Sequence, residues 1–261
     1  MKEQRPRSTP PRNKAERPSA PAPDPFDSHL ALLKDGQISS AALMPEGSNY
    51  TFLVGIKGGS GESCQAIYKP QAGERPLWDF PRGTLYKRER ATYVISRALG
   101  WPLVPPTIVR EGPHGVGSLQ LYVECEQEAN YFTLAKDRLD DFCKIALFDL
   151  LANNADRKAG HCLLGRDGRI WVIDHGLTFH AVFKLRTVIW DFCGQPIPKP
   201  LLENVETFLA GLSASDGMAV ELSKWLSADE IEALKHRGRI LLDNPVFPEL
   251  DPRRNIPWPW F

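Results

Sequence analysis

The sequence predicts an α+β fold made of a small antiparallel β lobe and a larger, mainly helical lobe. Two observations carry this prediction. Between residues 37 and 69, three short apolar stretches are separated by glycine-containing turns, which is the pattern of an antiparallel meander. From residue 139 onward, apolar side chains recur at helical spacing in several longer segments. A strand-rich half followed by a helix-rich half is typical of α+β proteins.

Composition limits the classes of protein that this chain can represent. It has 261 residues, of which 42% are hydrophobic, with 32 acidic and 32 basic side chains. Zero net charge argues against non-specific nucleic-acid binding. No apolar run approaches the ~20 residues that span a bilayer, and the N-terminus lacks the apolar stretch of a secretory signal. Five scattered cysteines without a Cys-x-x-Cys pair favour reduced thiols. We expect a cytoplasmic protein with no membrane span and no nucleic-acid partner.

Changes in composition along the chain predict four regions. Residues 1–25 are rich in proline and charge, with no large apolar residue after Met1, so we expect a disordered tail. Residues 26–124 form the predicted β-rich lobe and residues 125–250 the helical lobe. Residues 251–261 form a C-terminal tail that either docks onto the domain or is disordered.

The β lobe has a lysine at a distinctive position. Its predicted strands cover residues 37–44, 50–56, 63–69 and 118–124. Lys69 ends the third strand, and Pro70 terminates the pairing. The glycine-bearing turns before and after the second strand can cradle a phosphate through backbone N–H groups, or they are plain hairpin turns. Neither has the Gly-Lys-Ser/Thr ending of a P-loop.

A helix predicted for residues 86–99 lies between the third and fourth of these strands, and Gly100 stops it. Its charged first turns contain Glu89, which belongs either to a solvated face or to an ion pair with Lys69. Further helices are predicted at residues 139–152, 201–212 and 216–226, and from Ser227 to about residue 242. Ser227 and Glu230 have the spacing of a capping box.

Two acidic residues flank a predicted β-hairpin in the second half of the chain. Asp156 precedes the hairpin and Asp174 follows it, with a turn at residues 165–168 between two apolar strands. Antiparallel pairing brings both carboxylates to the same end of the ribbon, with His161 between them. This arrangement suits a metal–phosphate site. Because the preceding helix at residues 139–152 is largely apolar, it offers a buried, rigid support for the loop.

Here the sequence resembles a family. The segment Asp156-Arg-Lys-Ala-Gly-His161, followed by Ile173-Asp-His-Gly176, is similar to the catalytic and metal-binding loops of phosphatidylinositol 3-/4-kinases. Those loops read Asp-Arg-His-x-x-Asn and Ile-Asp-Phe-Gly. The Asn154-Ala-Asp156 segment also resembles the Asn-x-Asp of HipA-type bacterial kinases. The chain is most similar to a bacterial family of kinase-like, phosphatidylinositol-kinase-related proteins, which implies a two-lobed protein-kinase-like fold.

The resemblance implies a role for each candidate residue. It makes Asp156 the catalytic base and Asp174 the principal Mg²⁺ ligand, with His161 at the second metal position. It implies that the β lobe binds ATP and that the helical lobe is catalytic. The implied nucleotide contacts are Ser48 and Asn49 in the first glycine turn, Lys69 and its partner Glu89, and Leu121 and Val123 beside adenine. ATP, Mg²⁺ or Mn²⁺, and a hydroxyl-bearing acceptor are therefore the expected cofactors and partners.

The loops also depart from the family pattern. His161 replaces the asparagine that ligates the second metal, and imidazole suits Mg²⁺ less well than an amide oxygen does. Lys158 replaces the family histidine, and His175 replaces the phenylalanine that positions the metal-binding aspartate. These changes imply a preference for Mn²⁺, an altered geometry or weak catalysis.

Three other interpretations remain open. Asp156 and Asp174 are structural residues if each only caps a turn. A nucleotide-binding pseudokinase scaffold fits the replacement at His161. A zinc hydrolase is a further alternative, because His161, Cys162, Asp174, His175 and His180 have metal-ligand chemistry.

Overall fold

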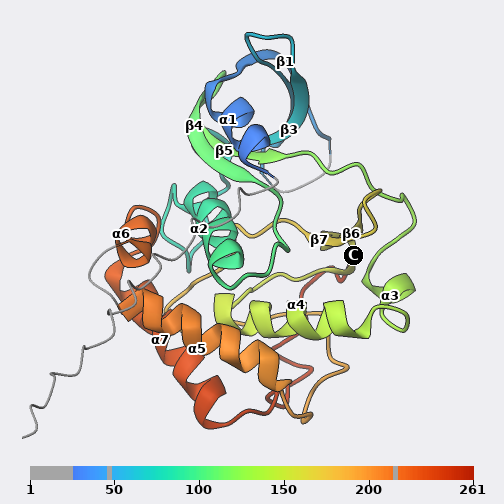
Figure 1. Ribbon diagram of the computed structural model, residues 1–261, viewed down its shortest axis with the longest axis vertical. Coiled ribbons are helices and arrows are strands. Elements are labelled where there is room, and N and C mark those ends of the chain that lie inside the picture. Colours follow the sequence, from blue (N-terminus) through green and yellow to red (C-terminus); the bar gives the residue numbers. More distant parts are fainter. Residues whose placement is uncertain (1–25, 46–48, 214–216) are drawn as a thin grey trace, which may run out of the picture.

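The computed structural model describes residues 26–45, 49–213 and 217–261. The predicted disordered tail at residues 1–25 and the candidate nucleotide contact Ser48 lie outside this part of the chain. Figure 1 shows a β-sheet with α1 (Asp27–Asp35) at one end of the molecule and α4 (Leu139–Ala152), α5 (Lys199–Ser213) and α7 (Ala228–Asp243) at the other, with α2 (Leu85–Ala98) between them. The α+β class is confirmed.

The sheet has five antiparallel strands in the order β1-β2-β3-β5-β4. The strands are β1 (Gln37–Leu43), β2 (Phe52–Lys57), β3 (Ser63–Pro70), β4 (Thr107–Gly112) and β5 (Gly115–Leu121). The predicted meander is thus β1-β2-β3, and the β4-β5 hairpin adds to its β3 side. Leu32 and Leu33 of α1 are buried against Val54, Ile56 and Tyr68 of the sheet, so α1 covers one face.

The last strand of the sheet ends earlier than predicted. β5 stops at Leu121, whereas the sequence pattern extended to residue 124. The backbone beyond it turns toward a second, smaller sheet, since Glu124 O accepts from Arg166 N and Glu126 N donates to Leu164 O. The apolar pattern could not reveal this change of partner, because it reports burial and not which strand is paired.

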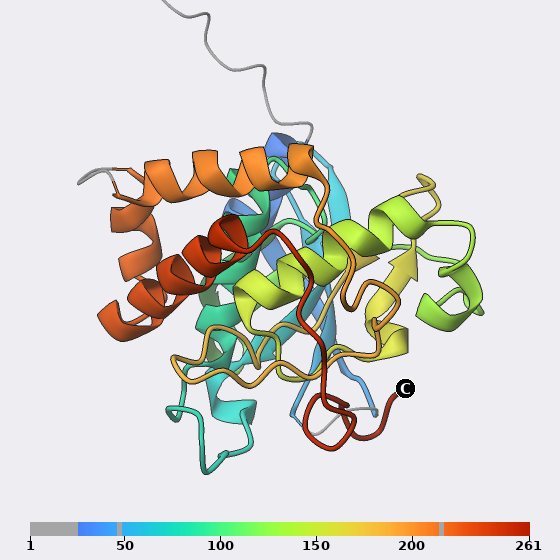
Figure 2. The same ribbon diagram turned by 90° about the horizontal axis from the view of Figure 1, so that it is seen from below.

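The helical half packs around α4. The residues of α4 that are buried in the main core include Phe142, Ile145, Leu147, Phe148 and Leu151. Side chains of α2, α5 and α7 belong to the same core, and Figure 2 shows these helices around α4. The capping box predicted at Ser227 is confirmed, because its side chain accepts from Glu230 N and Glu230 Oε2 accepts from Ser227 N.

The remaining elements are short. They are α3 (Tyr131–Leu134), α6 (Met218–Ser223), the 3-10 turns η1 (Gln71–Gly73) and η2 (Ala159–His161), and the hairpin strands β6 (Cys162–Leu164) and β7 (Ile170–Val172). Helix α6 is shorter than the predicted 216–226 span, whose first residue lies outside the described part. The chain must leave the helical conformation before Ser227, whose backbone is extended as the cap of α7. No described helix is long and apolar enough to cross a membrane.

Candidate functional site

Three charged residues from distant parts of the chain meet between the sheet and the helices. Lys69 on β3 places its Nζ 2.5 Å from Oε1 of Glu89 on α2 and 2.7 Å from Oδ1 of Asp174, which follows β7. Glu89 is almost fully buried, whereas half of the Asp174 side chain is exposed. Lys69 therefore joins the sheet, α2 and the hairpin in one ion-pair network.

The charges of this network stabilise one another. Burial alone would lower the pKa of Lys69, but the carboxylates of Asp174 and Glu89 outweigh it and hold that pKa above its ordinary value. The Lys69 ammonium in turn holds the pKa of Asp174 far below the usual range of an aspartate. Both groups are therefore charged at neutral pH, which suits a site that binds phosphate and cations.

Asp156 lies on a loop that leaves the end of α4. The helix ends at Asn153, which takes the left-handed conformation with a φ of 51°. Asn154 Oδ1 then accepts from Asp156 N at 3.0 Å, which fixes the loop. Burial raises the pKa of the Asp156 carboxyl to about 6, although the nearby ammonium of Lys158, 3.4 Å away, opposes this shift.

A buried ion pair fastens this loop to α4. The Arg157 guanidinium donates from Nε and Nη2 to the two oxygens of Asp149, at 2.8 and 2.9 Å, and both side chains are buried. Arg157 also donates to Ile173 O at 3.1 Å and lies 2.7 Å from Nε2 of His175. One side chain thus connects the loop of Asp156 with the loop of Asp174.

His161 faces Asp174 from the end of η2. Burial lowers the pKa of His161 to about 4, so the ring is neutral at physiological pH. The N–H of Lys158 points at Nδ1, 3.4 Å away, which assigns the ring hydrogen to Nε2. Nε2 lies 3.4 Å from Oδ2 of Asp174. In this arrangement the Nε2 edge of the neutral ring lies beside the Asp174 carboxylate.

Most of the candidate residues line one cavity of about 420 Å³. Those that do so are Asn49, Lys69, Glu89, Asp156, His161 and Asp174. Asn49 also supports the fold, since its Oδ1 accepts from Arg75 N at 2.7 Å. Leu121 instead lines a separate cavity beside β3, and Val123 is not among the residues that line the site cavity.

The cavity also contains residues that were not expected from the sequence. Phe261 forms part of its wall, because Ala159 N donates to Trp260 O at 2.9 Å and holds the end of the chain beside the loop of Asp156. In Figure 1 this end lies next to β6. The tail thus docks onto the domain, one of the two outcomes expected for it. Its aromatic composition was the available signal, but it did not indicate where the tail would dock.

The five residues of the zinc-hydrolase interpretation do not gather in one site, although His161 and Asp174 lie side by side. Cys162 is fully buried, His175 faces Arg157, and His180 Nε2 lies 2.8 Å from Asp79 O. Within residues 26–45, 49–213 and 217–261, no group of three or more acidic, histidine or cysteine side chains is placed to hold a metal.

Comparison with solved structures identifies the fold. The Golgi casein kinase with Mn/ADP bound superposes with a TM-score of 0.57 at 16% identity, covering 84% of this chain and 74% of that one. A hydra Fam20 structure with sugar gives a TM-score of 0.50 at 15% identity, covering 82% and 86%. The fold is therefore kinase-like, as the family resemblance implied.

Sequence relatives extend this result, although no family model matches the chain. Phosphatidylinositol 4-kinase gamma 4 of Oryza sativa subsp. japonica is 28% identical over 67% of this chain and 37% of its own length. The similarity to HipA-type kinases stays a prediction. Protein Rv2133c of Mycobacterium tuberculosis is 40% identical over 90% of this chain and 96% of its own length. The chain belongs to the same family as Rv2133c, a family with a kinase-like fold.

Proposed function

We propose that this protein is an ATP-dependent phosphotransferase that moves the γ-phosphoryl group of Mg- or Mn-ATP to a hydroxyl group of a protein or small molecule. The observation that carries the proposal is the position of Lys69. It contacts Glu89 and Asp174 at once, in a cavity that Asp156 also lines. These residue types in one cavity supply the parts that phosphoryl transfer needs.

In this mechanism Lys69 binds the phosphates and Glu89 orients its ammonium. Asp156 accepts the proton of the acceptor hydroxyl. With a pKa of about 6 this carboxyl is ionised at neutral pH, yet it is more basic than an ordinary aspartate. The Lys158 ammonium beside Asp156 places a second positive charge where phosphate oxygens would lie. Leu121 and Val123 remain the proposed adenine contacts, and Ser48 remains a proposed phosphate contact.

The residues around Asp174 fit a divalent cation that arrives with the nucleotide. Asp174 offers a half-exposed carboxylate, and His161 lies beside it. Mg²⁺ sites of this kind use one or two protein ligands and complete the shell with phosphate oxygens and water. When bound, the cation offsets negative charge on the phosphates. For His161 to act as a ligand through Nε2, its hydrogen must move to Nδ1.

One observation favours a nucleotide-binding scaffold as the second candidate. The N–H of Lys158 points at Nδ1 of His161, which assigns the ring hydrogen to Nε2, so the ring presents no free lone pair to a metal beside Asp174. A protein that binds Mg- or Mn-nucleotide without turning it over would fit this contact. Zero net charge and the lack of a membrane-spanning helix among the described residues give no reason to prefer a lipid acceptor.

The test is ATP consumption by the full chain with Mg²⁺ or Mn²⁺ against a panel of hydroxyl acceptors. Replacing Asp156 by Asn should lower the rate by roughly 10²–10⁴ and leave nucleotide affinity nearly unchanged, because only the base is lost. Asp137→Asn is the matched control, since Asp137 is exposed and lies away from the cavity. Binding of nucleotide without any turnover would establish the scaffold instead.

A further inference from the structure

Arg237 on α7 is a buried cation that the proposed chemistry does not use. Its side chain is 9% exposed, and it donates from Nε to Leu151 O at 2.9 Å and from Nη1 to His180 O at 3.4 Å. Nη2 is buried without a hydrogen-bond partner among the described residues. The guanidinium therefore reaches two neutral carbonyls and leaves part of its hydrogen-bonding capacity unused.

The charge of Arg237 is also uncompensated. Burial lowers its pKa to about 10, against the opposing effect of Glu230. Glu230, however, is already paired with Arg88. Among the described residues no carboxylate forms an ion pair with Arg237. Buried cations are costly unless an anion pairs with them, so this position calls for a negatively charged partner from outside the chain.

Arg237 lines a cavity of about 490 Å³ in the helical half, which lies within the size range of ligand pockets. The walls come from α4, α7, the segment after Asp174 and the chain that follows α7. Their side chains are mainly apolar: Leu150, Phe183, Ile240, Leu241, Val246, Phe247 and Pro248. Asn244 and Glu249 are the other polar side chains of the lining.

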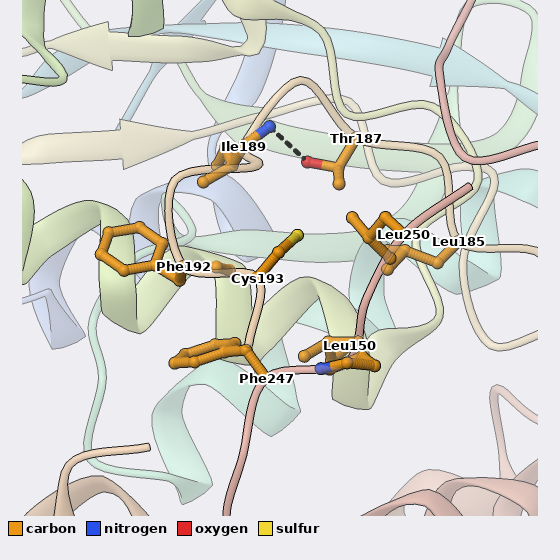
Figure 3. Close-up of a pocket in the computed structure, with 10 residues that line it drawn as sticks. Leu150, Leu185, Thr187, Ile189, Phe192, Cys193, Phe247 and Leu250 are labelled. Atoms are coloured by element: carbon orange, nitrogen blue, oxygen red, sulfur yellow. Dashed lines mark hydrogen bonds between the residues drawn. The ribbon is translucent and has the colours of Figure 1, made fainter. Parts of the chain in front are cut away.

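Apolar side chains lie at the mouth of this cavity as well as along its wall. Phe183 and Ile240 are about half exposed, so apolar surface extends from the cavity to solvent. Leu150 and Phe247 line both this cavity and a neighbouring void of about 20 Å³, in whose lining Figure 3 labels them. That void has room for about one water molecule.

We propose that this cavity binds an amphiphilic monoanion, with an aliphatic chain along Phe183 and Ile240 and a carboxylate toward which Arg237 turns its buried, unpaired Nη2. The exposed carboxylate of Glu249 in the lining would repel a group that carries two negative charges, which favours a carboxylate over a phosphate ester. The site is independent of phosphoryl transfer. The ligand would lie next to the carbonyl of Leu151, at the end of the helix that supports the loop of Asp156.

Calorimetric titration of the full chain with octanoate tests this site. We expect one octanoate per chain. Octan-1-ol, which has the same chain and no charge, and acetate, which has the charge and no chain, should each bind at least tenfold more weakly. Arg237→Gln should weaken octanoate binding by at least tenfold.

A second variant tests the same site if Arg237→Gln fails to fold. Ile240→Glu places a negative charge at the mouth of the cavity on an exposed position, and it should also weaken octanoate binding at least tenfold. Val220→Glu is the matched control, because Val220 is an equally exposed apolar residue on another helix and should leave binding unchanged. Equal affinity for octanoate and octan-1-ol, or unaltered binding by Ile240→Glu, would overturn the proposal.

Discussion

Lys69 on β3 and Glu89 on α2 form an ion pair in which Nζ lies 2.5 Å from Oε1. The second oxygen of Glu89 accepts from His175 N at 3.1 Å, so the same carboxylate also holds the loop of Asp174. We expect Glu89→Gln to weaken binding of Mn-ADP by about 10- to 100-fold, because a charge-assisted hydrogen bond to Lys69 is lost.

A fluorescence titration of the wild type and of Glu89→Gln with Mn-ADP measures this change in affinity. Glu203→Gln serves as the control, since Glu203 is exposed on α5 and does not line the cavity. An unchanged affinity in Glu89→Gln would show that Lys69 needs no second carboxylate to meet the phosphates.

The sequence predicted those features of the site and of the fold that depend on local pattern. Lys69 follows from an apolar strand closed by Pro70, and the capping box at Ser227 depends on residues three apart. Glu89 was left between two interpretations, because helical periodicity does not reveal which distant strand the helix faces. Neither the docking site of Phe261 nor the pairing of Arg157 with His175 was predicted. Those contacts depend on how separate elements pack, which no local pattern encodes.

Asp156 makes stability depend on pH in the nucleotide-free protein. Its folded-state pKa of about 6 exceeds its ordinary value of 3.8, so the folded state binds the proton more tightly than the unfolded state does. The free energy of unfolding should therefore fall as pH rises from about 4 to about 6. Asp156→Asn removes this loss and should stabilise the protein by up to about 3 kcal/mol at pH 7.5.

Urea unfolding of both proteins at pH 4 and pH 7.5 measures this effect. The gain from Asp156→Asn should nearly vanish at pH 4, where the wild-type carboxyl is already protonated. Asp137→Asn should show no such difference between the two pH values. Equal gains at both pH values would mean that burial does not raise the pKa of Asp156.

His161 should determine which metal supports nucleotide binding. Replacing it with asparagine supplies an amide oxygen that suits Mg²⁺ better than imidazole does. We expect His161→Asn to improve the affinity for ADP in Mg²⁺ relative to Mn²⁺ by several-fold. Titrations in each metal give this ratio, and His236→Asn, at an exposed position on α7, is the control. The same ratio in all three proteins would remove His161 from the metal site.

The buried pair of Asp149 and Arg157 should dominate the stability of the loop that carries Asp156. Asp149→Ala leaves the Arg157 guanidinium buried without its counter-charge, and breaking such a pair costs about 3–5 kcal/mol. The double variant Asp149→Leu with Arg157→Met should lose less than Asp149→Ala alone, because no uncompensated charge remains. Urea midpoints of the wild type, Asp149→Ala and the double variant measure the order of their stabilities. A greater loss of stability in the double variant than in Asp149→Ala would contradict this prediction.

Phe261 should keep water away from the site. Its ring lines the cavity that Asp156 also lines, packs 3.8 Å from the position that a Gly160 Cβ would take, and is held through the bond from Ala159 N to Trp260 O. Because the ring is 70% exposed, Phe261→Ala removes little buried surface and should leave the melting temperature nearly unchanged. If the proposed transfer reaction is correct, opening the cavity admits water as a competing acceptor, so ATP hydrolysis without added acceptor should rise several-fold.

Trp258→Ala is the matched control, since Trp258 is exposed in the same segment and does not line the cavity. Equal hydrolysis by Phe261→Ala and Trp258→Ala would show that the ring does not exclude water.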